Sequence, residues 1–439
     1  MKGELKVKKR LVTLLLVLSM TGTMVTGCGA GGKGESTSKD SGKEVLTFMA
    51  VGGSAEQAFT DVIEAAAEDF NNSNEYNVEI KLEWYENEQY KTKLATLMTQ
   101  DDVTDIFFTW EAGFMEDYVN SGKVASLSEA LESDEEWMGR FNDGAFDAVT
   151  YDNEIYAVPM GQAIIPVYYN KQIFADNEVE IPVTWEEFTA AIQTFKDAGV
   201  TPIAMGSQDA WVAGQMMLEL SGGVGGKALF DDIVNGETAW DDERYVETGK
   251  TFQELVDLGA FQEGFLGISG DEARMTFTEG NAAMYPMGTW DTATVISGFG
   301  GSENVGVFLM PAKYAENNDT RIKTIEKLFA VSEKSENKEA AFAFLKTLSD
   351  PEVQENYVIT CGALPATNVQ IDESAIDPVT ADIMTLQQEV KNALTPMDRQ
   401  FGANVGGEFN NISAAIAGGA DAAEQFAALQ AYAEQEAAQ

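Results

Sequence analysis

The chain has 439 residues, with 28 Lys or Arg, 72 Asp or Glu, two cysteines and no histidine. The absence of histidine excludes Ser-His-Asp and Cys-His catalysis and zinc helices of the H-E-x-x-H type. The formal charge of −44 argues against a nucleic-acid partner, because phosphate binding needs clusters of Lys and Arg. A hydrophobic content of 44% is ordinary for a folded protein, so we expect the acidic residues on the surface of a globular body.

The first 27 residues have the pattern of an export signal. Basic residues gather in residues 2–10, an apolar run extends from Leu11 to Met20, and small residues precede Cys28. This order predicts a signal peptide. The apolar run is short for a membrane span, so an uncleaved anchor helix is the less favoured alternative. Residues 28–43 are rich in Gly, Ser and Lys, which predicts a flexible tether.

The segment Val25-Thr26-Gly27-Cys28 also resembles a bacterial lipobox, in which cleavage leaves Cys28 as a lipid-carrying N-terminus. Several acyl chains would hold the protein at a membrane, since each buried CH₂ contributes about 0.8 kcal/mol. Removal of residues 1–27 leaves 23 basic and 71 acidic residues, a charge of −48. With Cys28 lipidated, Cys361 has no disulfide partner, and we expect it to be a buried, inert thiol.

The body of the chain alternates between strand and helix patterns. The expected strands are 45–51, 78–84, 105–110, 166–170, 202–206, 282–287, 305–310 and 328–331. The expected helices are 59–70, 90–99, 211–220, 244–258 and 338–348, with a further helix that starts at the capping box Thr184–Glu187 and stops at Gly199. From Pro378 the chain is expected to be mainly helical. The alternation predicts βαβ units with a mostly parallel sheet, and its restart near Pro166 predicts two α/β lobes.

Several segments resemble motifs of one protein family. Residues 277–290 (FTEGNAAMYPMGTW) fit F-x-x-G-x-A-A-M-x-x-x-G-x-W, and residues 169–174 and 182–188 resemble Y-N-K-x-x-F and P-x-T-W-E-E-F. Lys93-Leu94, 105–107 and 156–159 also match in order and spacing. The likeness covers roughly residues 44 to 420. The chain thus resembles the family 1 extracellular solute-binding proteins, the maltose-binding-protein-like components of bacterial sugar ABC transporters. Thr104 stands where the family usually has proline.

The resemblance implies an α/β fold of the type II periplasmic-binding-protein kind, a two-lobed clamp with a hinge of crossing segments. Carried onto this chain, lobe one is residues 44–157 with 311–365, and lobe two is residues 158–310 with 366–439. The crossings would lie near Val158-Pro159, Met310-Pro311 and Leu364-Pro365, where proline limits the freedom of the backbone.

Three tryptophans are expected at the ends of strands, where ligands bind in open α/β sheets. Trp110 follows the third strand, Trp211 the loop after strand 202–206, and Trp290 the turn at Gly288. Sugars present apolar C–H faces and hydroxyls, which flat aromatic rings and planar polar groups recognise. Each tryptophan taken singly could equally be a core residue, but the shared position favours a ligand cleft. The polar candidates, for which a solvated surface position is the alternative, are Glu56, Glu111, Gln162, Asp209, Asp291 and Arg399.

The resemblance implies a receptor and not an enzyme. We expect a lipid-anchored monomer on the outer face of the bacterial cytoplasmic membrane. It would capture a sugar, with an oligosaccharide favoured, and deliver it to the permease of an ABC transporter. No cofactor, metal or nucleic acid is expected.

Two alternatives stay open. The same fold could bind a peptide, an amino acid or a polyamine, although the carboxylate of an amino acid or peptide calls for arginine, and Lys and Arg are scarce. A surface glycosidase or adhesin is the other. A glycosidase needs two carboxylates about 5–10 Å apart, and with 71 acidic residues in the mature chain such a pair carries no information.

Overall fold

The computed structural model describes residues 42–438, without the side chain of Ala55. The predicted signal peptide of residues 1–27, the predicted lipidation site Cys28 and all but the end of the predicted tether lie outside the described residues. Residues from Lys43 onward form one compact unit. Among residues 42–438, none of the helices combines the length and the apolar character that a membrane span requires.

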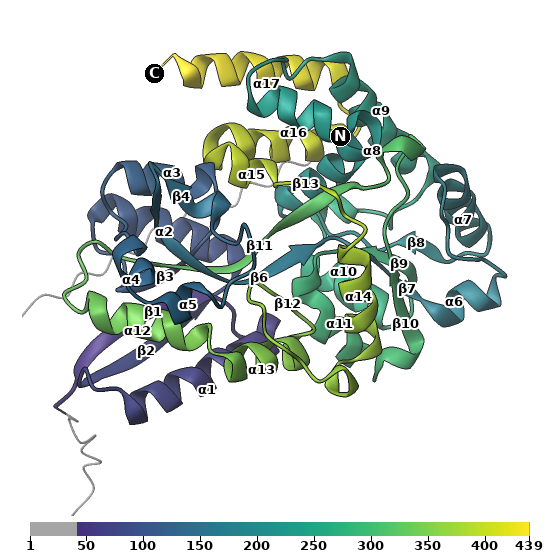
Figure 1. The fold of residues 1–439 in the computed structure, drawn as a ribbon. Helices are drawn as coiled ribbons and strands as arrows, with labels where there is room; N and C mark the ends of the chain where they lie inside the picture. The colour runs from purple at the N-terminus through teal and green to yellow at the C-terminus, as the bar shows by residue number, and fades with distance from the viewer. Residues whose placement is uncertain (1–41, 439) are drawn as a thin grey trace, which may run out of the picture. The chain divides into compact units, whose positions relative to one another are not determined.

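The strands fall into two main sheets and one hairpin (Figure 1). They are β1 Glu44–Val51, β2 Val78–Tyr85, β3 Ile106–Thr109, β4 Thr150–Tyr151, β5 Glu154–Ile155, β6 Ala157–Ile164, β7 Val167–Asn170, β8 Thr201–Ile203, β9 Ala282–Pro286, β10 Val305–Phe308, β11 Thr320–Val331, β12 Leu364–Pro365 and β13 Asn392–Leu394.

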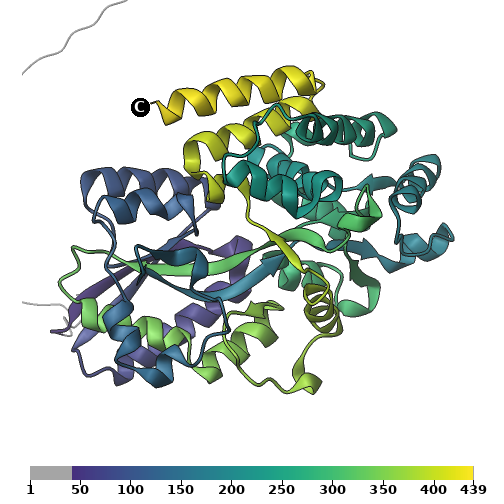
Figure 2. The ribbon, with the colours of Figure 1, turned by 45° about the horizontal axis from the view of Figure 1, so that its top comes forward.

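The helices cover these sheets. They are α1 Gln57–Ser73, α2 Asn87–Gln100, α3 Gly113–Asn120, α4 Ser128–Glu132, α5 Glu135–Met138, α6 Lys171–Asp176, α7 Trp185–Asp197, α8 Ala210–Val234, α9 Glu243–Leu258, α10 Gly270–Thr278, α11 Thr292–Gly298, α12 Lys338–Leu348, α13 Pro351–Cys361, α14 Pro378–Gln387, α15 Met397–Gln400, α16 Gly407–Ala417 and α17 Ala422–Ala437. Figure 2 shows α16 and α17 beside α8 and α9, with which they pack.

Both main sheets are mixed, so the predicted mostly parallel sheet is wrong. The first sheet has the order β12-β6-β11-β3-β1-β2, with β13 beside the start of β11. β1 is parallel to β2 and β3, whereas β11 is antiparallel to β3 and β6. The second sheet has the order β10-β7-β9-β8, and only β8 and β9 are parallel. A parallel neighbour requires a crossover helix, and β6 and β11 enter the first sheet without one.

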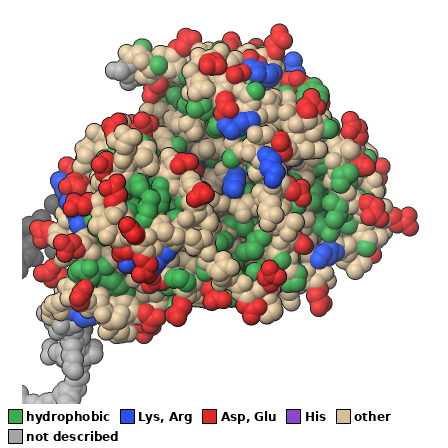
Figure 3. Space-filling view, in the orientation of Figure 1, with side chains coloured by type: hydrophobic (Ala, Val, Ile, Leu, Met, Phe, Trp, Pro, Cys, Tyr) green, Lys and Arg blue, Asp and Glu red, His purple; other side chains and the backbone are tan. Residues whose placement is uncertain are grey.

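Each sheet has its own hydrophobic core. In the first core, Phe48 of β1 lies between Phe329 and Phe344, with ring centroids 5.2 and 6.0 Å away. In the second core, Tyr285 of β9 packs against Phe277 of α10 at 5.6 Å. Figure 3 shows acidic side chains scattered over the visible face, which is the expected place for the charge excess.

The predicted helix starts are confirmed where the local signal is strong. The hydroxyl of Thr184 accepts a hydrogen bond from the backbone N–H of Glu187 at 3.2 Å, and the Glu187 carboxylate accepts one from the backbone N–H of Thr184 at 3.1 Å. Gly199, with φ +75°, follows the last turn of α7 as predicted.

Three elements differ from the prediction. β6 occupies residues predicted as a hinge crossing, because Pro159 and Gly161 conceal the strand pattern, yet both pair with β11. β11 begins eight residues earlier than predicted, since its first half is rich in charged residues. α8 continues beyond the predicted end at Leu220 through a glycine-rich stretch. A Cβ on Gly223 would lie 3.1 Å from the backbone nitrogen of Lys313, so glycine allows this close approach.

β11 contributes to both cores. Ile322 belongs to the second core, while Leu328 and Val331 belong to the first. The predicted lobe boundaries stay a prediction. Thr320 lies against Gly222 of α8, and Ala312 and Lys313 lie against Gly223. Because these residues before Ile322 already pack on α8, we propose that the chain passes between the lobes inside β11 and not at Met310-Pro311.

A buried ion pair connects α8 to the start of β11. Arg321 Nε and Glu219 Oε2 are 3.9 Å apart, too far for a hydrogen bond but close for two charges. The other carboxylate oxygen of Glu219 accepts a hydrogen bond from the backbone N–H of Ile322 at 2.9 Å. Burial raises the pKa of Glu219 to about 7, although Arg321 and the hydrogen bond oppose the rise.

We expect Glu219→Gln to change how stability depends on pH. The folded pKa of about 7 lies above the ordinary 4.5, so between these values the folded protein binds the extra proton. Its free energy of unfolding therefore falls as the pH rises through this window. The loss from this carboxyl is on the order of 3 kcal/mol, and the glutamine variant lacks it. Denaturant unfolding across the window, from acidic to neutral pH, measures the difference between variant and wild type.

The matched control is Glu129→Gln on the exposed face of α4. Its difference from wild type should stay constant with pH. A difference for Glu219→Gln that is equally flat would contradict the raised pKa.

Candidate ligand-binding cavity

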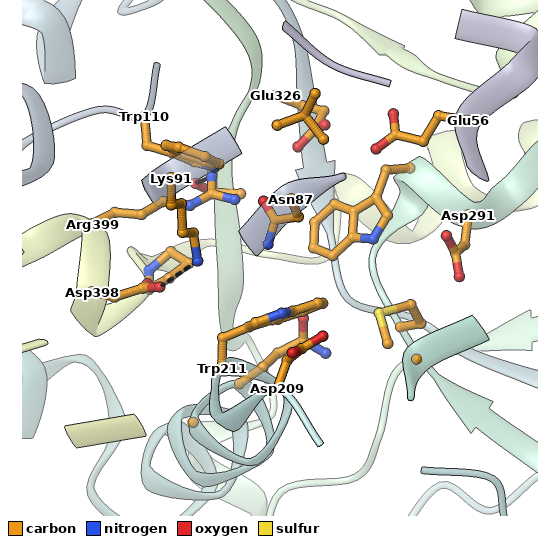
Figure 4. Close-up of a pocket in the computed structure, with 18 of the residues that line it drawn as sticks. Glu56, Asn87, Lys91, Trp110, Asp209, Trp211, Asp291, Glu326, Asp398 and Arg399 are labelled. Atoms are coloured by element: carbon orange, nitrogen blue, oxygen red, sulfur yellow. Dashed lines mark hydrogen bonds and ion pairs between the residues drawn. The ribbon is translucent and has the colours of Figure 1, made fainter. Parts of the chain in front are cut away.

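The main cavity lies where strand ends of both sheets meet β11, and its volume is about 280 Å³. This is just below the roughly 300–1,000 Å³ typical of small-molecule sites. Figure 4 shows side chains from both lobes around it, with Trp110, Lys91 and Arg399 on one side and Glu56 and Glu326 on another. Of the nine predicted ligand-binding residues, the three tryptophans Trp110, Trp211 and Trp290 all line the main cavity.

The tryptophans differ in how much of each ring is available. Trp110 is 7% exposed and packs edge-on against Phe108 and Phe114, with centroids 4.8 and 4.7 Å away. Trp211 and Trp290 are partly buried, and their ring centroids are 6.3 Å apart at an angle of 62°. The Trp211 indole N–H is buried without a hydrogen-bond partner among the described residues. Trp211 and Trp290 therefore offer the more accessible ring surfaces.

Gly288 permits the placement of Trp290, but not by the predicted turn. Its φ of −65° is available to any residue. A Cβ at this position would instead lie 2.2 Å from atoms of the Trp290 ring. Glycine is required because the indole folds back over the backbone that precedes it.

Asp291 follows Trp290 and is buried at the wall of the main cavity. It accepts a hydrogen bond from the Tyr285 hydroxyl at 2.7 Å and faces Arg274 at 3.3 Å. Burial raises the pKa of Asp291, while Arg274 and Tyr285 oppose the rise. Arg274 also pairs with Asp271 at 2.6 Å, which fixes the guanidinium between two carboxylates.

Glu56 lines the main cavity together with the buried amine of Lys327. Lys327 has φ +55°, a left-handed conformation within β11, and its Nζ contacts Glu56 and lies 3.0 Å from Glu326. The amine also lies 4.5 Å from the centroid of the Phe59 ring. Burial lowers the pKa of Lys327, but the two carboxylates outweigh this and raise it above its ordinary value. The lysine is therefore charged.

Asp209 lines the main cavity at the start of α8. Its carboxylate has no hydrogen bond or ion pair within the described residues. Burial raises the pKa of Asp209, with Glu88 and Asp271 adding to the rise and Lys91 opposing it. Figure 4 shows Asp209 beside Trp211.

Arg399 also lines the main cavity, whereas Glu111 and Gln162 do not. Glu111 is 2% exposed and lies behind Arg399 with an Oε2–Nη1 distance of 3.4 Å. Arg399 donates to the Thr324 hydroxyl at 2.7 Å, so Glu111 helps to position it. Gln162 accepts a hydrogen bond from Gln387 at 2.6 Å and borders a smaller cavity of about 20 Å³. Whether any of these side chains contacts a ligand stays a prediction.

Several lining residues were not predicted. Among the charged and amide side chains they include Glu86, Asn87, Lys91, Asp271, Arg274, Glu326, Lys327 and Asp398. Asn87 and Lys91 open α2 directly after β2, so the strand-end rule could have found them. Lys327 gave no signal, because a charged residue inside a strand ordinarily faces solvent.

Other sequence predictions also bear on the chemistry. Cys361 is the free cysteine of the described residues; it is buried, and burial raises its pKa to about 12, so it is a protonated thiol as predicted. Within residues 42–438, no group of three or more Cys, Asp or Glu side chains is arranged to hold a metal ion.

Two α/β lobes around a ligand-sized cavity define a clamp-type binding protein. Residues 53–355 match the model of the bacterial extracellular solute-binding protein family, and the chain belongs to this family. It is therefore an extracellular solute-binding protein, and the predicted type II fold is confirmed.

The chain is 27% identical over 301 residues to an uncharacterized ABC transporter extracellular-binding protein of Pyrococcus horikoshii, covering 65% of this chain and 68% of that protein. It is 24% identical over 236 residues to the multiple sugar-binding protein of Streptococcus mutans, covering 52% of this chain and 56% of that protein. These matches span only part of the relatives' length.

Solved structures agree with the fold over almost their whole length. A structure from work on xylan utilization by Caldanaerobius polysaccharolyticus has a TM-score of 0.81 and 28% identity, covering 88% of this chain and 99% of the other. A chitin oligosaccharide binding protein has a TM-score of 0.83 and 22% identity, covering 90% and 98%.

We expect Lys327→Met to lower the free energy of unfolding by about 3–5 kcal/mol, because it leaves buried carboxylates without their cation. Denaturant unfolding of the unliganded protein measures the loss. The triple variant Glu56→Gln/Glu326→Gln/Lys327→Met should recover most of it, since the unpaired charges are gone.

The control is Lys323→Met, four residues earlier in β11, where the half-buried lysine has no ion-pair partner among the described residues. Lys323→Met should lower the free energy of unfolding far less than Lys327→Met does. Equal losses for both single variants would show that the Lys327 ion pairs contribute nothing.

Proposed function

We propose that this protein captures a saccharide, with an oligosaccharide favoured, in the main cavity and delivers it to the permease of an ABC transporter. The observation that carries the proposal is the pair Trp211 and Trp290, 6.3 Å apart in a cavity that also presents carboxylates and an amide. Rings of this kind stack on the C–H faces of sugars, while planar polar groups accept or donate hydrogen bonds to the hydroxyls.

Relatives support a saccharide over other solutes. Besides the multiple sugar-binding protein of Streptococcus mutans, a maltotriose-binding protein of Pyrococcus abyssi is 23% identical over 308 residues. Among structural neighbours, one was solved with raffinose and one with stachyose. These ligands belong to those proteins, and the sugar of the present chain follows from its own cavity walls.

The proposed mechanism uses no covalent chemistry. The ligand enters between the lobes, which close by bending at β6 and β11. The closed form docks on the permease, and opening releases the sugar, while other subunits hydrolyse ATP. The export signal and the lipidation of Cys28 would keep this monomeric receptor at the outer face of the cytoplasmic membrane.

A calorimetric panel of oligosaccharides, amino acids, peptides and polyamines, combined with a hydrolysis assay, tests this function. Saccharide binding without turnover supports the proposal. Binding of only a non-sugar solute, or turnover that one carboxylate substitution abolishes, would overturn it. Identification of the ligand that copurifies from the native source gives the sugar directly.

We expect Trp290→Ala to weaken saccharide binding by at least about 1–2 kcal/mol, which is roughly 5–30-fold in Kd, through lost stacking. Calorimetry measures the affinity, and thermal unfolding checks that the variant stays folded. Trp185→Ala is the control, because Trp185 packs against Phe188 at the start of α7 and does not line the main cavity. Unchanged affinity in Trp290→Ala would make Trp290 a packing residue.

A further inference from the structure

We propose that the main cavity selects its ligand by charge. It takes neutral or amine-bearing saccharides and excludes those that carry carboxylate, sulfate or phosphate. Glu86 and Asp209 are the residues that set this selectivity. The inference rests on the proposed function and specifies the class of saccharide.

Among the helices that begin at the main cavity is α10, which Ser269 caps in the usual way. Four others are each preceded by an acidic residue. These residues are Glu56 before α1, Glu86 before α2, Asp209 before α8 and Asp291 before α11, and all four line the cavity. None of the four side chains accepts a hydrogen bond from the backbone of its own helix. Aspartate at this position ordinarily makes that bond, so Asp209 and Asp291 depart from the usual role. Glutamate is not among the preferred capping residues, so Glu56 and Glu86 add carboxylates to the cavity without any such departure.

Elsewhere in the described chain the usual role is kept. The acidic residues that cap their own helices are Asp134 of α5, Asp242 of α9, Asp377 of α14 and Asp421 of α17. Asp350 before α13 is an exception, and it pairs with Arg140 instead. Asp209 and Asp291 at the cavity therefore differ from these four aspartates, while α10 at the same cavity keeps the cap of Ser269.

The four basic side chains that line the main cavity are each already paired. Lys91 lies 3.0 Å from Glu88 and 3.8 Å from Asp398. Arg399 lies 3.4 Å from Glu111. Arg274 and Lys327 are each held between two carboxylates, as described above. An anionic group on a ligand would therefore meet each of these cations beside a carboxylate that already balances its charge.

Glu86 and Asp209 have no ion-pair partner among the described residues, unlike Glu56 and Asp291. A bare helix N-terminus attracts anions through its N–H groups and dipole. In this cavity the protein's own carboxylates occupy those positions. The two unpaired carboxylates accept hydrogen bonds, so they favour a ligand that donates them. Hydroxyl and ammonium groups are donors, whereas an ionised carboxylate is not. Like charges brought together repel most strongly where water is partly excluded, and this applies to the half-buried Asp209 more than to the exposed Glu86.

Three tetrasaccharides with related backbones test the proposal by calorimetry: cellotetraose, the glucosamine tetramer and the glucuronic acid tetramer. The wild-type protein should bind the acidic tetramer at least about tenfold more weakly than cellotetraose, and the amine-bearing tetramer no more weakly. The double variant Glu86→Gln/Asp209→Asn should reduce the gap between cellotetraose and the acidic tetramer to less than about threefold.

The control Glu339→Gln/Glu352→Gln removes two exposed carboxylates from α12 and α13, outside the main cavity. It changes the net charge equally and should leave the wild-type gap intact. Equal binding of the acidic and neutral tetramers by wild type, an unchanged gap in the cavity variant, or an equal narrowing in the control would overturn the proposal. If none of the three tetramers binds, and no saccharide of the calorimetric panel binds either, the proposed function itself fails.

Discussion

β11 has to serve two hydrophobic cores at once, and the arrangement of the cavity follows from this constraint. Ile322 is buried with the second core and Leu328 with the first, six residues further along the same strand. Between them Lys327 adopts φ +55°, a conformation that costs a non-glycine residue of order 1 kcal/mol or more. The kink brings a buried amine to the cavity, where Glu56 and Glu326 stabilise its charge. The strained backbone at Lys327 and the ion pairs of its amine therefore occur together, because the same kink that is strained also places the amine beside the two carboxylates.

The same strand ends that build the two cores also decide which groups meet the ligand. The N-termini of α1, α2, α8, α10 and α11 lie at the main cavity, so the positive ends of five helix dipoles converge there. Left alone, this convergence would favour an anion. A capping aspartate contributes about 0.5–2 kcal/mol to its helix, and α8 and α11 forgo that contribution at the cavity. The loss is tolerable because these helices are stabilised mainly by packing against the cores.

Local signals in the sequence were sufficient where a few adjacent residues determine the outcome. The Thr184–Glu187 box and the Gly199 stop were predicted because all the interacting groups lie within one turn. β6 and the first half of β11 were missed because their pairing, not their composition, makes them strands. The strand-end rule placed Trp110, Trp211 and Trp290 at the cavity, but it could not separate Asp291 from Glu111. Asp291 lines the cavity, whereas Glu111 lies behind Arg399 and bonds to its guanidinium. Arg399 is 288 residues from Glu111 in the chain, so no local pattern could show this contact.

The charge of the whole chain and the charge of the cavity have different consequences. At physiological ionic strength, charges in solvent are screened over about 8 Å, so most of the acidic surface has little effect on a ligand inside the lobes. It keeps the body soluble and away from anionic lipid. Carboxylates in the cavity wall act at short range and with less screening. Seven acidic and four basic side chains line it, and the basic ones are paired. Selectivity by charge therefore depends on the one or two carboxylates that the protein leaves without a cation, and Asp209, beside the accessible ring of Trp211, is the one best placed to act on a bound sugar.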